Sequence, residues 1–175
     1  MTTTKSCFHL DIGRLNDFAQ AVKDDPEKAK FTFAAKTTWR DGAVTETRAR
    51  EHVIAADEPE VLGGTDSAAD PVELLLASLA SCVSIGLVTQ AARRGVEIRD
   101  FEIEVEGELD VRGYLGYEDV RPGFTAVRYT LKVDSDAPVG VLEEIVKTVE
   151  RTSPMFDNIS KGVPVSSRLE VVAPA

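Results

Sequence analysis

The sequence predicts an α+β fold in which antiparallel sheets wrap around one long, buried central helix. Residues 70–94 have the composition of a helix that is apolar on every side, and the segments before and after it alternate between apolar and polar residues. The elements follow in the order helix, hairpin, long helix, hairpin, helix and strand, which is typical of antiparallel pairing. The 175 residues, 43% of them hydrophobic, suffice for one core.

The first helix that the periodicity predicts lies near the N-terminus. Residues 10–23 place apolar side chains at helical spacing, and Asp24-Asp25-Pro26 ends the pattern. Only one side of this helix is apolar, so we expect it to lie on the periphery. We assign residues 1–30 to an N-terminal amphipathic helix extension and residues 31–175 to the main domain.

A hairpin is predicted next. Residues 31–40 alternate between apolar and polar side chains, as expected of a strand with one buried face. Asp41-Gly42 is a strong turn signal, and residues 43–54 read as the returning strand. Residues 55–69 form the loop that leads into the central helix.

The central helix has clear start and stop signals. Asp70 is a suitable N-cap, Pro71 fits the first helical position, and Glu73 is spaced to complete a capping box. Arg93-Arg94-Gly95 marks the end. The helix, about 36 Å long, is long enough for a membrane span, but the serines along it argue against lipid. An all-round apolar helix in so small a chain predicts a second subunit that covers it.

A second hairpin follows the central helix. Residues 101–109 alternate between apolar residues and glutamates, residues 112–123 form a long turn, and residues 124–133 alternate again. The polar side of the second strand carries Arg128 and Lys132. Antiparallel pairing would set these cations against the glutamates, so we interpret the glutamate row as a salt-bridged sheet surface and not as a metal site.

The C-terminal part is predicted to hold a helix, a loop and a strand. Asp136 and Pro138 open an amphipathic helix that ends before Ser153-Pro154. The residues after it read as a loop. Residues 165–172 then have the pattern of a final short strand.

Charge and cysteine content indicate a cytoplasmic protein that binds neither nucleic acid nor membrane. The formal net charge of -10 repels both surfaces at long range. The start, MTTTKSCFHLDIG, has no apolar run of the length that a signal peptide needs. The two cysteines, Cys7 and Cys82, do not resemble a disulfide framework, which favours a reducing compartment.

Three segments resemble the OsmC/Ohr family, which comprises osmotically inducible protein C and the organic hydroperoxide resistance proteins. The segments read LGGTDSAADPVELLLASLASC, RRGVEIRDFEIEVEGELD and SPMFDNISKGVPVS. The resemblance implies an OsmC-like fold and an intertwined homodimer with its site at the dimer interface. In the family's peroxidases, a cysteine on the central helix attacks the peroxide, a second cysteine resolves the sulfenic acid, and an arginine and a glutamate hold the thiolate.

The resemblance assigns two of these four roles to matching residues of this chain, and the other two residues do not match. The reactive cysteine matches Cys82, and the arginine of a Gly-Arg-Asp-Gly hairpin matches Arg40. The second cysteine belongs to a Cys-Pro-Val-Ser or Cys-Pro-Tyr-Ser segment, which we align with 163–166, where Val163 stands in place of the thiol. The glutamate is displaced by one residue, to Glu73.

Glu73 and Cys82 each have a structural interpretation beside the catalytic one. Nine residues at about 100° each put Glu73 on the opposite side of the helix from Cys82 and about 13 Å along it, so a capping role explains Glu73. Cys82 lies beyond the first helical turn among apolar residues, where it would pack as a small hydrophobe. It would be reactive only if Arg40 or a group of a partner chain approaches it.

We expect neither a metal nor a cofactor. Cys7 and His9 have a C-x-H spacing, but with one further histidine in the chain a zinc site is disfavoured against a frayed terminus. Cys7 could serve as a displaced resolving thiol only if the N-terminal helix covers Cys82.

Two functions remain open from the sequence. In the first, an enzyme reduces organic hydroperoxides through Cys82 in oxidative stress defence, and an external thiol resolves the oxidised cysteine. In the second, a non-catalytic homodimer binds a small hydrophobic molecule and Cys82 is structural. The retained Cys82 and Arg40 favour the first, and the absent second cysteine favours the other.

Overall fold

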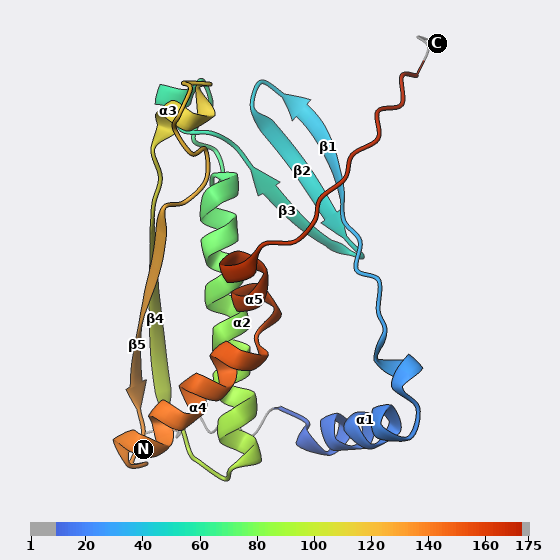
Figure 1. The fold of residues 1–175 in the computed structure, drawn as a ribbon, viewed down its shortest axis with the longest axis vertical. Helices are drawn as coiled ribbons and strands as arrows, with labels where there is room; N and C mark the ends of the chain where they lie inside the picture. Colours follow the sequence, from blue (N-terminus) through green and yellow to red (C-terminus); the bar gives the residue numbers. More distant parts are fainter. Residues whose placement is uncertain (1–9, 173–175) are drawn as a thin grey trace.

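The structure, a computed structural model, describes residues 10–172 and is built around one helix. Helix α2 (Pro71–Arg93) runs through the centre, with strands β4 (Asp100–Glu108) and β5 (Ala126–Asp134) along one side. Helices α4 (Val139–Thr152) and α5 (Pro154–Lys161) pack across it (Figure 1). The predicted α+β class with antiparallel sheets around a central helix is confirmed.

Helix α2 begins as its sequence predicts. The Asp70 carboxylate accepts a hydrogen bond from the Val72 amide at 2.8 Å, and the Asp70 amide donates to the Glu73 carboxylate at 2.9 Å. These two bonds form a capping box, which satisfies amides that have no partner inside the helix. The helix ends at Arg93, two residues before Gly95, whose φ is +65°.

The chain buries only one stripe of α2. Leu79, Val83, Leu87 and Ala91 recur every four residues, and they pack with Ile98, Ile145 and Val149. By length and mean hydropathy, 2.0 over 18 residues, α2 could cross a membrane. Its packing against β4, α4 and α5 instead makes it the core helix of the fold. Another face is open, because Ile85 is 65% exposed.

Strands β4 and β5 form the predicted antiparallel hairpin. Glu102 lies opposite Lys132 in the ladder, and Glu106 lies opposite Arg128. Lys132 pairs with Glu104 at 2.6 Å, and Arg128 pairs with Glu106 at 3.0 Å. The predicted salt-bridged surface is therefore confirmed, while the apolar faces of both strands turn towards α2 and the core.

The N-terminal elements match the prediction in kind but not in every boundary. Helix α1 (Ile12–Asp24) and a 3-10 turn, η1 (Pro26–Ala29), precede strand β1 (Lys36–Asp41), which is shorter than predicted. The returning strand is split into β2 (Val44–Ala49) and β3 (His52–Ala56). The break occurs at Arg50, whose φ of +56° turns the chain and adds a third strand to the sheet.

A hydrogen-bonded loop connects β3 to α2 and contains a second 3-10 turn, η2 (Glu60–Leu62). Asp57 is 1% exposed, and its carboxylate accepts bonds from the amides and hydroxyls of Thr65 and Ser67 and from the Glu58 amide. The Thr65 hydroxyl, followed by the Ser67 amide, holds the pKa of Asp57 well below its usual range. The charged carboxylate thus fixes the entry to α2.

The structure corrects three predictions in the later part of the chain. The long turn contains a short helix, α3 (Val111–Tyr114). Helix α5 replaces the predicted loop, because Ser153 caps it and Pro154 fits its first position. The strand expected at 165–172 is absent from the described chain, where residues 162–172 are irregular and exposed. An alternating pattern alone does not make a strand without a neighbour to hydrogen-bond.

Candidate functional site

Cys82 lies at the middle of α2, half-buried, where it faces the corner between α4 and α5. Its sulfur accepts a hydrogen bond from the Ser153 hydroxyl, with an Oγ to Sγ distance of 3.2 Å. Ser153 is 5% exposed and ends α4 as it begins α5. Helices α2, α4 and α5 therefore meet at this pair of side chains.

The Ser153 side chain is held by the backbone around it. Its amide donates to the Val149 carbonyl at 2.8 Å, and its Oγ accepts from the Phe156 amide at 3.2 Å. Because the amide of Phe156 occupies an acceptor position of Oγ, the hydroxyl hydrogen is free to point at sulfur. A donor in this position stabilises negative charge on sulfur.

Sequence reasoning missed Ser153. We aligned Val163 with the second cysteine, but Val163 follows α5 in the irregular segment and is 58% exposed. The residue that the structure sets against Cys82 is Ser153. The sequence did contain a signal for Ser153. This residue directly precedes Pro154, as the second cysteine directly precedes proline in the Cys-Pro-Val-Ser or Cys-Pro-Tyr-Ser segment of the family.

Arg40 lies near the end of β1, where the ladder to β2 is irregular. Trp39 pairs with Thr45 and Asp41 pairs with Val44, so the register shifts at Arg40. Such irregularities re-aim side chains. The Arg40 guanidinium lies 2.9 Å from the Glu46 carboxylate, and its hydrogen bond is the largest factor that lowers the pKa of Glu46.

Glu73 has the capping role. Its carboxylate accepts from the Asp70 amide, nine residues before Cys82 on the same helix. The three site residues that the sequence singled out thus have three different partners: Ser153 for Cys82, Glu46 for Arg40 and Asp70 for Glu73. None of the hydrogen bonds and ion pairs within residues 10–172 joins any two of the three.

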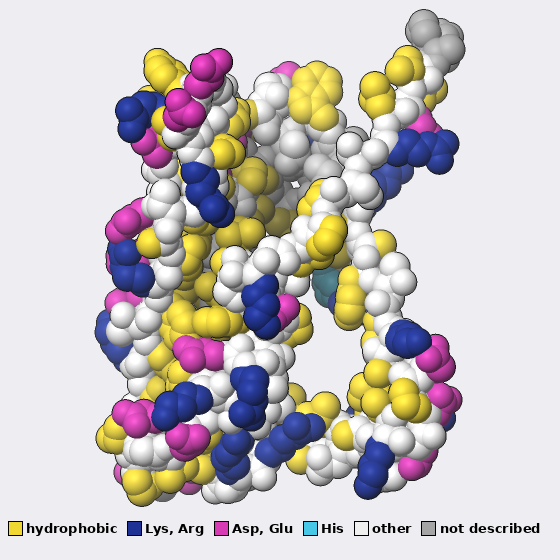
Figure 2. Space-filling view, in the orientation of Figure 1, with side chains coloured by type: hydrophobic (Ala, Val, Ile, Leu, Met, Phe, Trp, Pro, Cys, Tyr) yellow, Lys and Arg dark blue, Asp and Glu magenta, His cyan; other side chains and the backbone are white. Residues whose placement is uncertain are grey.

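A groove of about 1740 Å³ lies next to the Cys82 region, between β5 and helices α4 and α5. Leu79, one helical turn before Cys82, and Met155, two residues after Ser153, both line it. Figure 2 shows hydrophobic side chains in the hollow beside α5. Cys82 and Ser153 do not themselves line the groove, which comes closest to them in sequence at Leu79 and Met155.

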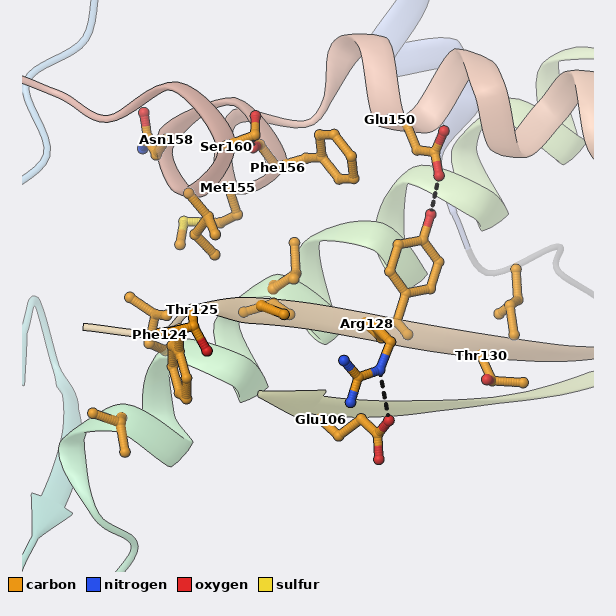
Figure 3. A pocket seen from close by; sticks show the side chains of 18 of the residues that line it. Glu106, Phe124, Thr125, Arg128, Thr130, Glu150, Met155, Phe156, Asn158 and Ser160 are labelled. Atoms are coloured by element: carbon orange, nitrogen blue, oxygen red, sulfur yellow. Dashed lines mark hydrogen bonds and ion pairs between the residues drawn. The ribbon is translucent and has the colours of Figure 1, made fainter. Parts of the chain in front are cut away.

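One wall of the groove carries a polar pair. The Tyr129 hydroxyl donates to the Glu150 carboxylate at 2.5 Å, from β5 to α4 (Figure 3). Burial, and after it the Glu150 carboxylate, raise the pKa of Tyr129, so this phenol stays protonated. Sequence reasoning did not single out either residue, because they are 21 positions apart and neither lies in a recognisable motif.

Residues 10–172 hold no group of three His, Cys, Asp or Glu side chains arranged to bind a metal ion. Cys7 and His9 lie outside the described residues. The prediction that Cys7 could approach Cys82 therefore concerns a part of the chain that the structure does not describe.

The comparisons with known proteins converge on one family. A family model described as OsmC-like protein matches residues 64–168. An OsmC-like protein from Mycoplasma pneumoniae has a similar structure, with a TM-score of 0.65 at 15% identity over 75% of this chain and 89% of that chain. Curated proteins provide no match.

Two further solved structures are organic hydroperoxide resistance proteins. The one from Legionella pneumophila, called OsmC, has a TM-score of 0.58 at 20% identity over 75% of this chain and 91% of that chain. The one from Elizabethkingia anophelis has a TM-score of 0.59 at 15% identity over 76% of this chain and 90% of that chain. These likenesses concern the fold, and the family model spans more than half of the sequence. The chain therefore belongs to the OsmC-like protein family.

Proposed function

We propose that this protein is a thiol-dependent peroxidase that reduces organic hydroperoxides through Cys82, with an external thiol as the reductant. The hydrogen bond from the buried Ser153 hydroxyl to the Cys82 sulfur carries the proposal. The thiolate is the form of cysteine that attacks a peroxide, and a donor aimed at sulfur stabilises it. The structural neighbours that are organic hydroperoxide resistance proteins support this reaction class.

The reaction balances with two thiols for each peroxide. The Cys82 thiolate attacks one peroxide oxygen, so that an S–O bond forms and the O–O bond breaks. The alkoxide that leaves takes up a proton and becomes the alcohol, and the sulfur is oxidised to a sulfenic acid. A first external thiol then displaces water to give a mixed disulfide, and a second thiol releases Cys82 and leaves as the external disulfide.

The groove supports an organic substrate over hydrogen peroxide. Leu79 and Met155 join the apolar lining to the surroundings of Cys82, so the hydrocarbon part of a hydroperoxide would be desolvated there. Hydrogen peroxide has no apolar part and gains nothing from the groove. We therefore expect a preference for bulky alkyl or aryl hydroperoxides.

Arg40 enters the proposal through a homodimer. Within one chain its guanidinium is paired with Glu46 on the β1–β3 sheet, whereas α2 packs chiefly with α4, β4 and α5. An intertwined dimer can bring Arg40 of one protomer to Cys82 of its partner, which completes the cation and thiolate pair. A reducing cytoplasm would supply the external thiol.

The test measures consumption of cumene hydroperoxide with dithiothreitol as the external thiol. We expect turnover by the wild type and by Cys7→Ser, and loss of turnover to background in Cys82→Ser. We also expect slower turnover of hydrogen peroxide at the same concentration. A Cys82→Ser variant that keeps the wild-type rate would overturn the proposal.

The size of the groove favours a second candidate function, the binding of a small hydrophobic molecule without catalysis. A fluorescent apolar probe, 1-anilinonaphthalene-8-sulfonate, tests it. This function predicts equal binding by the wild type and Cys82→Ser, and weaker binding by Leu142→Glu, which places in the lining a negative charge that repels the probe's sulfonate. Equal binding by Leu142→Glu would exclude the groove as the binding site.

A further inference from the structure

Resting on the proposed function, we infer that Ser153 is the positioning residue for Cys82, and that it stands where the family's peroxidases carry their second cysteine. Its hydroxyl holds the sulfur and stabilises its anion, but it cannot form a disulfide. The oxidised Cys82 is therefore left for an external thiol. The alignment made from sequence put Val163 at the position of the second cysteine, and this inference puts Ser153 there instead.

The direction of the hydrogen bonds is the first argument. Phe156 donates its amide to Ser153 Oγ, and Ser153 donates its hydroxyl to Cys82 Sγ. A chain of bonds in one direction polarises each donor, so the hydroxyl is a stronger donor to sulfur than an isolated serine. The Ser153 backbone is held as well, by the bond to Val149.

The second argument is that capping does not account for the contact with Cys82. An N-cap serine needs only a lone pair of its Oγ, which accepts from the first turn of the helix. Ser153 meets that need through Phe156, and the hydroxyl hydrogen could point in another direction and leave the cap intact. Its bond to sulfur is a separate interaction, and one between groups 71 positions apart.

The third argument is distance. Oγ and Sγ are 3.2 Å apart, so the two side chains already point at each other from α2 and the α4–α5 corner. A thiol in place of the hydroxyl would need only a small rotation to reach the S–S length of about 2.05 Å. Val163 lies ten residues further along, after α5.

The first experiment places a thiol at this position, in a Cys7→Ser background. Ser153→Cys should form a disulfide with Cys82 when treated with diamide, seen as loss of both free thiols and a mass lower by about 2 Da under non-reducing conditions. Thr152→Cys is the matched control, because its side chain is exposed and its Oγ bonds back to the Thr148 carbonyl. It should remain reduced at the same diamide concentration.

The oxidant separates this inference from the proposed function. With one equivalent of cumene hydroperoxide, Cys82 in Ser153→Cys should become a sulfenic acid, which the introduced thiol attacks to form the disulfide and water. A disulfide with diamide but not with the peroxide would support the placement of Ser153 and overturn the peroxidase. Free thiols after diamide would overturn the placement itself.

The second experiment measures the hydroxyl's effect on sulfur, again without Cys7. Alkylation of Cys82 by iodoacetamide at neutral pH should slow by about 3- to 10-fold in Ser153→Ala and stay within about twofold in Ser153→Thr, which keeps the hydroxyl. Asp11→Ala removes the N-cap of α1, which is not part of the α2, α4 and α5 corner, and should leave the rate unchanged. An unchanged or faster rate in folded Ser153→Ala would contradict the role of the hydroxyl.

Discussion

Asp57 carries a negative charge at a position that is 1% exposed, which is tolerated only because donors surround its carboxylate. Asp57→Asn would turn an amide group towards the hydroxyls and amides of Thr65 and Ser67, which already donate. We expect the melting temperature at neutral pH to fall by about 5 °C or more. Thermal unfolding followed by circular dichroism measures it.

Asp66→Asn is the matched control for Asp57→Asn. Asp66 is exposed in the same loop and has a φ of +54°, a conformation that asparagine tolerates. Its melting temperature should stay within about 2 °C of the wild type. Equal losses in the two variants would mean that the charge of Asp57 does not organise the loop.

The stabilisation by Asp57 should also depend on pH in a defined direction. Its pKa is lowered on folding, so the folded state favours the carboxylate and the stabilisation is present above the unfolded value of about 4. It is lost progressively as the pH falls below that value. The difference in melting temperature between wild type and Asp57→Asn should therefore narrow between pH 5 and about pH 3. A constant difference would contradict the lowered pKa.

Sequence alone could identify Cys82 and the capping role of Glu73, because each belongs to a local pattern. The cap needs only the three-residue spacing from Asp70, and the structure confirms it. The signal for Ser153, a serine before proline, was ambiguous, since the same dipeptide reads equally well as a turn and its partner Cys82 is 71 positions away. The role of Asp57 was missed although its partners lie within ten residues, because no sequence motif marks a carboxylate that loop amides and hydroxyls surround.

At the scale of elements, helices α2 and α4 approach closely at Gly86. A Cβ added at Gly86 would lie 2.8 Å from Val149 Cγ1, and Val149 is itself buried and stiff. Overpacking destabilises a fold by about 1 to 3 kcal/mol. The better helix propensity of alanine offsets about 1 kcal/mol of that loss. We therefore expect Gly86→Ala to lower the free energy of unfolding by about 1 kcal/mol, measured by urea denaturation.

Gly140→Ala is the control for Gly86→Ala. Gly140 lies in α4, and a Cβ there would meet no atom within 4 Å. The substitution should leave the free energy of unfolding unchanged or raise it by up to about 1 kcal/mol. A stabilised Gly86→Ala would show that Val149 can shift and that the two helices do not need glycine for their approach.

The elements that the sequence predicted well are those whose pattern is long and local. Helix α2 and the β4–β5 hairpin fall in this class. The break between β2 and β3 was missed because Arg50 adopts a positive φ without being glycine. Helix α5 is only eight residues long, too short for periodicity to distinguish it from a loop, and the alternation at 165–172 has no ladder partner in the described chain.

At the scale of the whole molecule, apolar side chains remain uncovered on α2 and on the β1–β3 sheet, where Ile85 and Trp39 are 65% and 68% exposed. A second copy of the chain would cover them, so we expect a homodimer at micromolar concentration. Ile85→Asp should raise the dissociation constant of the dimer by about tenfold or more, measured by sedimentation. Val139→Asp, at a comparably exposed position at the start of α4, should not. A folded wild-type monomer at that concentration would exclude the dimer.

The dimer leads to the last prediction, that Arg40 serves the Cys82 of the other protomer. Cys82→Ser and Arg40→Met should each be inactive or nearly so in cumene hydroperoxide reduction. When equal amounts are unfolded and refolded together, half of the dimers are hybrids. Each hybrid has one site with an intact cysteine and an intact arginine from opposite chains, so about a quarter of the wild-type activity should return.

The opposite arrangement gives a different result in the same mixture. If Arg40 acted on the Cys82 of its own chain, the hybrid would contain no complete site and the mixture would stay inactive. The double variant Cys82→Ser/Arg40→Met, refolded with Arg40→Met, is the control for refolding itself, because its hybrids have no arginine at position 40 and should stay inactive in either arrangement. Full activity of Arg40→Met alone would show that the Cys82 thiolate does not need this cation, and that its hydrogen bond from Ser153 suffices.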